Sequence, residues 1–186
     1  METPLVPDPT PPWYLRPLLW LTRLITGRDP LPARLLTLVP RAAFSVGVFE
    51  ALTPGSGQLD ARVLSVARIT ASRVGGCPFC LDMNAARWAK NGLQLDELRA
   101  VLDGRFDALP RREALAGQWA AALSSTPVVL APELISALRA SFSARELVTL
   151  AHAIAQVNYW TRFNQGLGVP AAGFYVDADR CALPLR

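Results

Sequence analysis

The sequence predicts an all-α protein. Its long apolar segments are separated by glycine or proline, and within each segment the apolar residues recur at helical spacing. No run alternates polar and apolar residues over the length of a half-buried strand. The chain has 186 residues, of which 51% are hydrophobic, so it is long enough for one globular unit with a sizeable core and too short for two.

The composition divides the chain into three parts. Residues 1–30 form an N-terminal arm and a short helix, residues 31–170 a single helical domain, and residues 171–186 a C-terminal tail. Within the first part, residues 13–25 have apolar side chains at helical spacing and end before Gly27, which predicts an amphipathic helix. We expect this helix to pack on its own domain, with contact to another subunit as the alternative, because its polar face has too few cations for a lipid surface.

The first half of the domain leads directly to the two cysteines. Residues 32–52 are densely apolar and predict one or two buried helices, broken near Pro40. After a loop rich in glycine and proline, Asp60 is a suitable N-cap for a helix that runs to Val74. This helix stops at Gly75, immediately before the cysteine pair.

The second half of the domain is also helical. Glycines, prolines or capping residues mark the ends of its apolar segments, and Ser143 followed by Glu146 forms a capping-box pattern. The helices expected here cover residues 81–91, 96–104, 111–124, 132–142 and 144–164.

The chemistry of the sequence is concentrated in Gly76-Cys77-Pro78-Phe79-Cys80, where one helix ends and the next begins. The first N–H groups of a helix have no internal partner and, together with the helix dipole, they favour an anion such as a thiolate. Pro78 fits the first helical turn because it has no N–H group. In a reducing compartment such a pair is redox-active or binds a metal, and is less suited to a permanent disulfide.

The charged residues exclude some classes of partner. The 19 basic residues exceed the 15 acidic ones to give a net charge of +4, but they are scattered arginines with Lys90 as the sole lysine, so we expect no nucleic-acid binding. The N-terminus is acidic and proline-rich, unlike a secretory signal, and no apolar stretch is long enough to span a bilayer. We therefore expect a cytoplasmic protein without a membrane segment.

A metal site is not expected. It would need four ligands, and Cys77, Cys80, Cys181 and His152 form the one candidate set. Cys181 lies in the tail without a second Cys-x-x-Cys motif, so we interpret it as a bystander and expect neither a metal nor another cofactor.

The order of the motifs resembles a known family. The acidic cap at Asp60, the Gly-Cys-x-x-Cys junction and the following Asp-Met pair precede a Gly-x-x-x-Asp-Glu-Leu helix start at residues 92–98. Residues 142–148 and 158–164 add the pattern of a last long helix. Together they resemble the carboxymuconolactone decarboxylase superfamily, and within it the alkylhydroperoxidase D-like branch. The resemblance covers residues 32–170 and implies an alkylhydroperoxidase D-like helical bundle that forms a homo-oligomer.

The resemblance also implies an activity. Similar proteins are thiol-dependent hydroperoxide reductases or disulfide oxidoreductases, and their pattern assigns the peroxide-reactive role to Cys80 and the resolving role to Cys77. Residues i and i+3 on a first helical turn bring two sulfurs within bridging distance, so the sulfenic acid is trapped as a disulfide. The implied partners are a hydroperoxide or disulfide substrate and an external thiol reductant.

Two positions depart from the family pattern. Where similar proteins have a proton-relay histidine and glutamate, this chain has Asn84 and Ser65. Neither side chain accepts and releases a proton near neutral pH, so we expect a weakened hydroperoxide reductase in which both residues are accessory. His152 is the sole histidine, and it could supply the missing base if its helix packs against the cysteine turn.

The sequence leaves the substrate pocket and two other functions open. Trp160 and Arg162 are candidates to line the pocket, with Arg162 attracting an anionic group, although such residues also brace helices. A non-catalytic or redox-sensing oligomeric scaffold is the alternative function. A carboxymuconolactone decarboxylase-type lyase is less well supported, because that branch does not rely on a cysteine pair.

Overall fold

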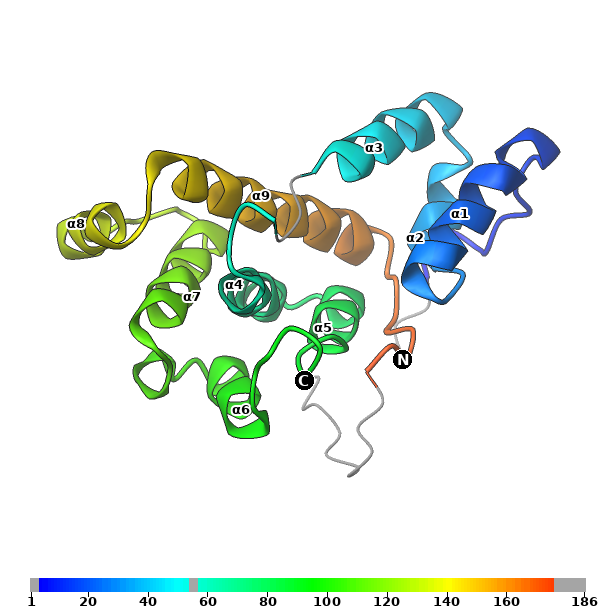
Figure 1. Cartoon of the computed structure of the whole chain (residues 1–186). Coiled ribbons are helices and arrows are strands. Elements are labelled where there is room, and N and C mark those ends of the chain that lie inside the picture. Colours follow the sequence, from blue (N-terminus) through cyan, green and yellow to red (C-terminus); the bar gives the residue numbers. More distant parts are fainter. Residues whose placement is uncertain (1–3, 54–56, 176–186) are drawn as a thin grey trace.

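The computed structural model describes residues 4–53 and 57–175, which fold into helices joined by turns (Figure 1). Within these residues there is no strand, so the all-α prediction is confirmed. No helix in the described part of the chain is long and apolar enough to cross a membrane. The helices are α1 Arg16–Thr26, α2 Leu31–Leu36, α3 Pro40–Leu52, α4 Ala61–Val74, α5 Pro78–Ala85, α6 Leu95–Asp103, α7 Arg111–Ser124, α8 Pro132–Ser141 and α9 Ala144–Gly166.

Helix α4 is the centre of the domain. It contacts α5, α6, α7 and α9, and Figure 1 shows it nearly end-on with these helices around it. The side chains of Val66, Ala67, Ile69 and Ala71 have no measurable exposure, so successive residues on different sides of the helix are all buried. Small residues on α4 allow the neighbouring helices to approach its backbone closely.

The ends of the helices follow the expected caps, with one difference. The Asp60 carboxylate accepts the Arg62 N–H at 2.7 Å, and the carboxylate of Glu146 accepts the Ser143 N–H at 2.8 Å. The helix after the cysteines was expected to reach about residue 91, but α5 ends at Ala85. Backbone hydrogen bonds between residues three or four apart then close a series of turns up to Gly92, whose φ of 84° suits glycine.

A partly exposed cluster of ion pairs joins α4 to its neighbours. The guanidinium of Arg62 on α4 donates to Glu97 on α6 at 2.6 Å and to Glu113 on α7 at 2.9 Å. It also donates to the carbonyl of Gly92. One side chain therefore links α4 to two neighbouring helices and to the turn that follows α5.

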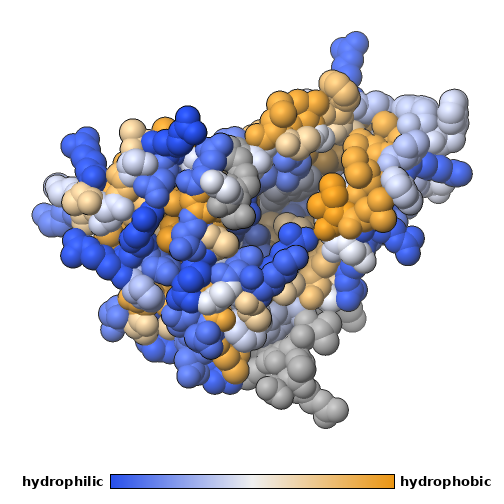
Figure 2. All heavy atoms as spheres, in the orientation of Figure 1, coloured by the Kyte–Doolittle hydropathy of each residue, from blue (hydrophilic) through white to orange (hydrophobic). Residues whose placement is uncertain are grey.

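The prediction that residues 32–52 are buried is wrong for α3. Of its residues only Ala43 is buried, whereas Phe44 is 72% and Leu52 is 76% exposed. Helix α3 has apolar residues around its whole circumference, and among the described residues it contacts α2 and, near its C-terminal end, α9. The exposed apolar residues of α1 and α3 lie over the same part of the surface (Figure 2).

Gly75, at the end of α4, permits a close approach of α9. Its backbone is right-handed, with φ −69°, so glycine is not required there by the backbone conformation. A methyl group at this position would overlap Cγ2 of Thr161, a side chain that is 1% exposed and has no room to move. Gly75 thus fixes the distance between α9 and the chain that enters the cysteine motif.

We predict that Gly75→Ala lowers the free energy of unfolding by about 1–3 kcal/mol, because overpacking forces α4 and α9 apart. The measurement is urea denaturation followed by circular dichroism. Gly166→Ala is the matched control, since a methyl group there meets no atom within 4 Å. Equal denaturation midpoints for the two variants would contradict the close-approach explanation.

Candidate active site

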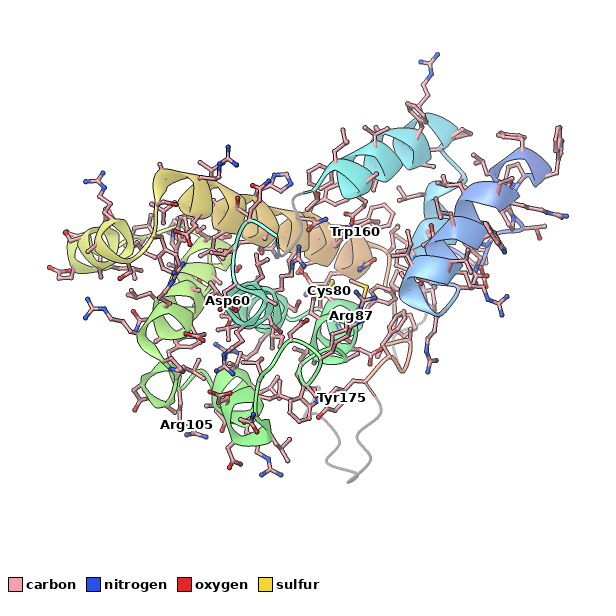
Figure 3. The ribbon with its side chains drawn as sticks, in the orientation of Figure 1. Asp60, Cys80, Arg87, Arg105, Trp160 and Tyr175 are labelled. Atoms are coloured by element: carbon pink, nitrogen blue, oxygen red, sulfur yellow. A yellow bond between two sulfur atoms is a disulfide. The ribbon has the colours of Figure 1, made fainter. Side chains whose placement is uncertain are left out.

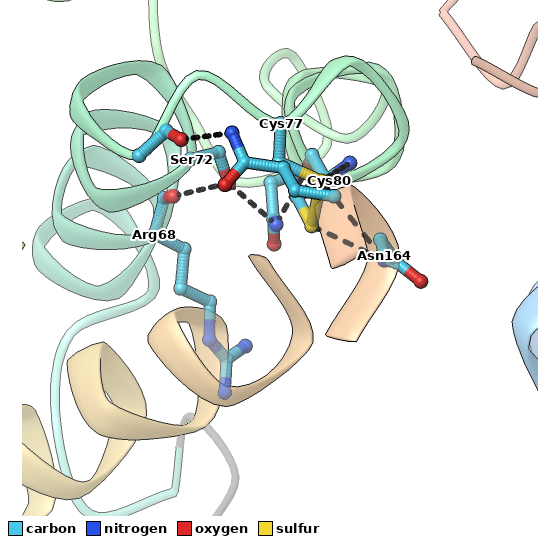
Figure 4. The surroundings of a disulfide bond; sticks show 8 residues. Arg68, Ser72, Cys77, Cys80 and Asn164 are labelled. Atoms are coloured by element: carbon cyan, nitrogen blue, oxygen red, sulfur yellow. Dashed lines mark hydrogen bonds between the residues drawn. A yellow bond between two sulfur atoms is a disulfide. The ribbon is translucent and has the colours of Figure 1, made fainter. Parts of the chain in front are cut away.

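The cysteine motif starts α5, as the sequence predicts. Cys77 is the N-cap, Pro78 is the first helical residue, and the Cys80 N–H donates to Cys77 Sγ at 3.2 Å. The two cysteines are joined as a disulfide, with their Cα atoms 5.3 Å apart (Figure 4). The i, i+3 spacing on the first turn therefore produces the expected bridge.

Both sulfurs are shielded from bulk solvent. Cys77 is 1% and Cys80 0% exposed, in an apolar cluster with Leu35 of α2, Phe79 of α5 and Val169 beyond α9. These neighbours come from three distant segments of the chain. A reactant therefore needs a cavity that reaches the sulfurs.

A cavity of about 770 Å³ adjoins the disulfide and includes Cys80 in its wall. Cys77 is not among the wall residues of this cavity. The wall is built from the end of α1, the end of α3, one side of α4 and α5, and the second half of α9. Figure 3 shows Cys80, Arg87 and Trp160 gathered in this region between α3, α5 and α9.

Asn164, in the last turns of α9, is the site residue that the sequence did not identify. Its Nδ2 lies 3.4 Å from Cys80 Sγ and 4.0 Å from Cys77 Sγ, and the residue is 1% exposed. A buried amide N–H that points at sulfur stabilises the thiolate more than the thiol. No clear signal for this role is present in the sequence, because Asn164 stands among the polar residues Thr161, Arg162 and Gln165 at the end of the helix.

Asn84 and Ser65 occupy the cavity wall, but neither forms a proton relay. Asn84 Nδ2 donates to the Cys80 carbonyl at 2.9 Å and to Ser72 Oγ at 3.0 Å, and the Ser72 hydroxyl donates to the Arg68 carbonyl at 2.8 Å (Figure 4). This chain of hydrogen bonds ends on a backbone carbonyl, which takes no proton. Ser65 Oγ is buried and has no hydrogen-bond partner among the described residues.

His152 does not replace the missing base, which corrects that expectation. Its Nε2 lies 3.2 Å from Thr53 Oγ1, and its ring lies 5.2 Å from that of Phe49. Helix α9 does pack against α5, but through its C-terminal end, and His152 precedes Asn164 by roughly 18 Å along the helix at about 1.5 Å per residue.

The two pocket candidates on α9 lie on different sides of the helix. The structure places Trp160 in the cavity wall, where its Nε1 donates to Glu50 Oε1 at 2.7 Å. Arg162 is exposed and outside that wall, so the expectation that it lines the pocket is wrong. Two residues along a helix correspond to a rotation of about 200°, which turns Arg162 away from the cavity. Cys181, the remaining candidate, lies outside the described residues.

Asp82, two residues after the motif, holds the end of the described chain against α5. Its buried carboxylate accepts the N–H groups of Ala172 and Phe174 at 2.9 Å each and of Tyr175 at 2.7 Å. Three charge-assisted hydrogen bonds offset the removal of this carboxylate from water. The clamp positions the Phe174 ring against Phe79 and in the cavity wall.

We predict that Asn164→Leu raises the thiol pKa of Cys80 in the reduced protein by about 1–2 units, because a hydrogen bond to a charged group is lost. The thiolate absorbance measured against pH gives this pKa. Asn158→Leu is the control on the same helix, since Asn158 donates to the Leu123 carbonyl and does not contact sulfur. If both variants titrate like the wild type, Asn164 does not stabilise the thiolate.

Comparison with known proteins agrees with this geometry. A model of the carboxymuconolactone decarboxylase family matches residues 42–128. The uncharacterized protein YnjA of Escherichia coli (strain K12) is 32% identical over 164 residues, which are 87% of this chain and 90% of YnjA.

Solved structures share the fold. ATU0492 from Agrobacterium tumefaciens, a protein of unknown function proposed to be the antioxidant defence protein AhpD, is 25% identical with a TM-score of 0.67, over 76% of this chain and 96% of its own. The debrominase Bmp8, solved with 2,3,4-tribromopyrrole, is 18% identical with a TM-score of 0.76, over 92% of this chain and 91% of its own. The chain therefore belongs to the carboxymuconolactone decarboxylase family, as a member of its alkylhydroperoxidase D-like group with the Cys77–Cys80 pair.

Proposed function

We propose that this protein is a thiol-dependent hydroperoxide reductase that works through Cys80 and Cys77. The observation that carries the proposal is the position of Cys80, which lines a cavity large enough for an organic molecule while its sulfur is within bonding reach of a second cysteine. The family includes enzymes, and the cysteine pair is the site in this chain with redox chemistry. The likeness to the debrominase, at 18% identity, is one of fold and does not select the substrate.

The reaction starts from the reduced pair. The Cys80 thiolate attacks the terminal oxygen of the hydroperoxide, the O–O bond breaks, and the alkoxide that leaves takes up a proton to become an alcohol. Cys80 is then a sulfenic acid, which condenses with the Cys77 thiol to give the disulfide and one water molecule. An external dithiol returns two electrons and two protons and restores both thiols.

The absence of the family's relay residues changes how the thiolate arises. A general base is needed only if Cys80 is a thiol at the working pH, and a lowered pKa makes the base unnecessary. Asn164 Nδ2, 3.4 Å from the sulfur, supports such a lowered pKa, as do the guanidinium-bearing residues Arg28, Arg68 and Arg87 of the cavity wall. We expect turnover that is slower than with a relay but that persists toward lower pH.

One observation favours a second candidate function. Both sulfurs are buried, and the hydrogen bonds from Asn84 end on the Arg68 carbonyl without a proton acceptor. A pair with these properties suits a redox-sensing member of the family that cycles slowly between dithiol and disulfide. The two functions differ in whether hydroperoxide is consumed catalytically.

We predict that the wild type consumes cumene hydroperoxide in the presence of a dithiol, and that Cys80→Ser abolishes this activity. In Cys77→Ser, Cys80 still attacks the hydroperoxide, but no second thiol is present to form the disulfide. The sulfenic acid on Cys80 therefore persists after one turnover and can be trapped with dimedone. Asn84→His supplies an imidazole at the relay position and should raise the rate by about 100-fold or more, the range typical of general-base catalysis.

The control for this series is Cys181→Ser, which removes the third cysteine of the chain and should leave the rate unchanged. No peroxide consumption by the wild type, with a gain only in Asn84→His, would reject the enzymatic function and leave the sensing function. If Cys181→Ser and Cys80→Ser lost the same amount of activity, the assignment of Cys77 and Cys80 as the reacting pair would be rejected.

We also propose that the protein self-associates through α1 and α3. Trp20, Leu24 and Ile25 on α1 are each at least 60% exposed, as is Phe44 on α3, so the described residues 4–53 and 57–175 leave them largely uncovered. Contiguous apolar surface of this kind marks an interaction site, and a second copy is the usual partner in soluble oligomers.

We predict that Phe44→Glu lowers the solution mass measured by light scattering after gel filtration, because a carboxylate at the interface cannot be desolvated without a partner. Val129→Glu is the matched control, since Val129 is 71% exposed in the connection between α7 and α8. A wild-type protein that is monomeric at micromolar concentration would contradict this interface.

A further inference from the structure

The arginines of this protein differ in whether they bind a carboxylate. Five of them, Arg62 among them, each form at least one ion pair with a described residue, at distances between 2.5 and 3.3 Å. Arg28, Arg68 and Arg87 line the cavity beside Cys80, and none of them has a carboxylate within salt-bridge distance in the part of the chain that the structure describes. The cations without ion pairs thus include those that face the redox site.

Arg68 differs from the other two in its hydrogen bonds. Arg28 donates to the Ala172 carbonyl at 2.8 Å and Arg87 to the Ile25 carbonyl at 3.1 Å, but the Arg68 guanidinium makes no hydrogen bond to any described residue. Burial lowers the pKa of Arg68, and Arg87 lowers it further, while Glu50 opposes them; an arginine nevertheless remains charged. A half-buried guanidinium without protein partners leaves five N–H donors free to bind an anion in the cavity.

The carboxylate available in the wall does not fill this role. Glu50 is the one acidic residue of the cavity, and its Oε1 accepts the indole N–H of Trp160 at 2.7 Å. Three cations against one anion leave the wall with an excess of positive charge. The planar guanidinium fork is matched best by a carboxylate, which accepts two parallel hydrogen bonds.

A second cavity, of about 310 Å³, opens next to the first. The two share the wall residues Ile25, Thr26, Glu50, Met83 and Trp160. Helices α1, α2 and α3 form most of the second cavity, and its other wall residues are apolar apart from Thr22. A polar, positively charged chamber therefore continues into an apolar one, with Cys80 in the wall of the former.

We infer that the two cavities together bind a carboxylate amphiphile, with the carboxylate on Arg68 and the alkyl chain in the apolar cavity between α1, α2 and α3. This inference rests on the proposed function for its chemistry: the natural substrate is a fatty-acid-like hydroperoxide whose peroxide group lies beside Cys80. Each methylene buried in the apolar cavity should tighten binding about 4-fold. The same carboxylate pairs the guanidinium that is otherwise without a partner.

Binding is tested with decanoate by titration calorimetry on the oxidised protein, so that no turnover is required. Decanamide is the neutral probe of the same length. Decanoate should bind at least 10-fold more tightly than decanamide, and Arg68→Met, which keeps the apolar stem of the side chain, should remove that difference. Arg139→Met is the control, because Arg139 is an exposed arginine of α8 without an ion pair among the described residues.

The apolar cavity is tested separately with Gly47→Leu. A Cβ atom at Gly47 meets Leu18 Cδ1 at an ordinary 3.8 Å, so the helix tolerates a side chain that then fills the cavity. This variant should weaken decanoate at least 10-fold and leave butanoate unchanged. If Arg68→Met does not fold, as judged by its melting curve, Arg87→Met tests the charge of the same wall.

The outcomes separate this inference from the proposed function. Equal affinity for decanoate and decanamide, no heat with decanoate at millimolar concentration, or equal effects of Arg68→Met and Arg139→Met would overturn the carboxylate site. Loss of binding in Gly47→Leu for butanoate as well as decanoate would overturn the division into two chambers. Peroxide consumption is measured independently, so its absence would reject the proposed function while the calorimetry still decides whether the site binds an amphiphile.

Discussion

The close packing of α4 is the constraint on which the rest of the structure depends. Most residues of this helix are buried, and its small residues and terminal Gly75 allow α9 to approach the chain that enters the cysteine motif. The approach brings Asn164 to the sulfurs and Trp160 to the cavity. Because α4 cannot shift without opening the core, the distances at the redox site are set by packing rather than by any contact within the site itself.

The site combines burial with access. Removing a disulfide from bulk solvent protects it from adventitious exchange, and one sulfur must still meet a reactant. The molecule meets both conditions because Cys77 caps α5 inside the apolar cluster while Cys80 borders the cavity. Asp82 completes the enclosure, since its clamp on residues 172–175 holds Phe174 in the wall.

The replacement of the family's histidine and glutamate is consistent with the electrostatics of the cavity. Asn84 and Ser72 use their hydrogen bonds to brace α5 against α4, so the relay position has become structural. In the proposed reaction, positive charge in the cavity wall and the Asn164 amide take the place of a proton acceptor by stabilising the thiolate. The same unpaired charge makes the cavity suited to an anion, so activation of the cysteine and recognition of the ligand would draw on one set of residues.

The sequence by itself determined the elements of this protein: the helical class, the caps at Asp60 and Ser143, and the Cys77–Cys80 turn, because each depends on neighbours within a few residues. Only the tertiary structure decided which residues meet at the site. Asn164 and His152 lie on the same long helix, and only the contact of its C-terminal end with α5 distinguishes them. The sequence could not decide whether α3 is exposed in the single chain. An apolar helix has the same pattern of residues whether the core of its own chain or a second copy covers it.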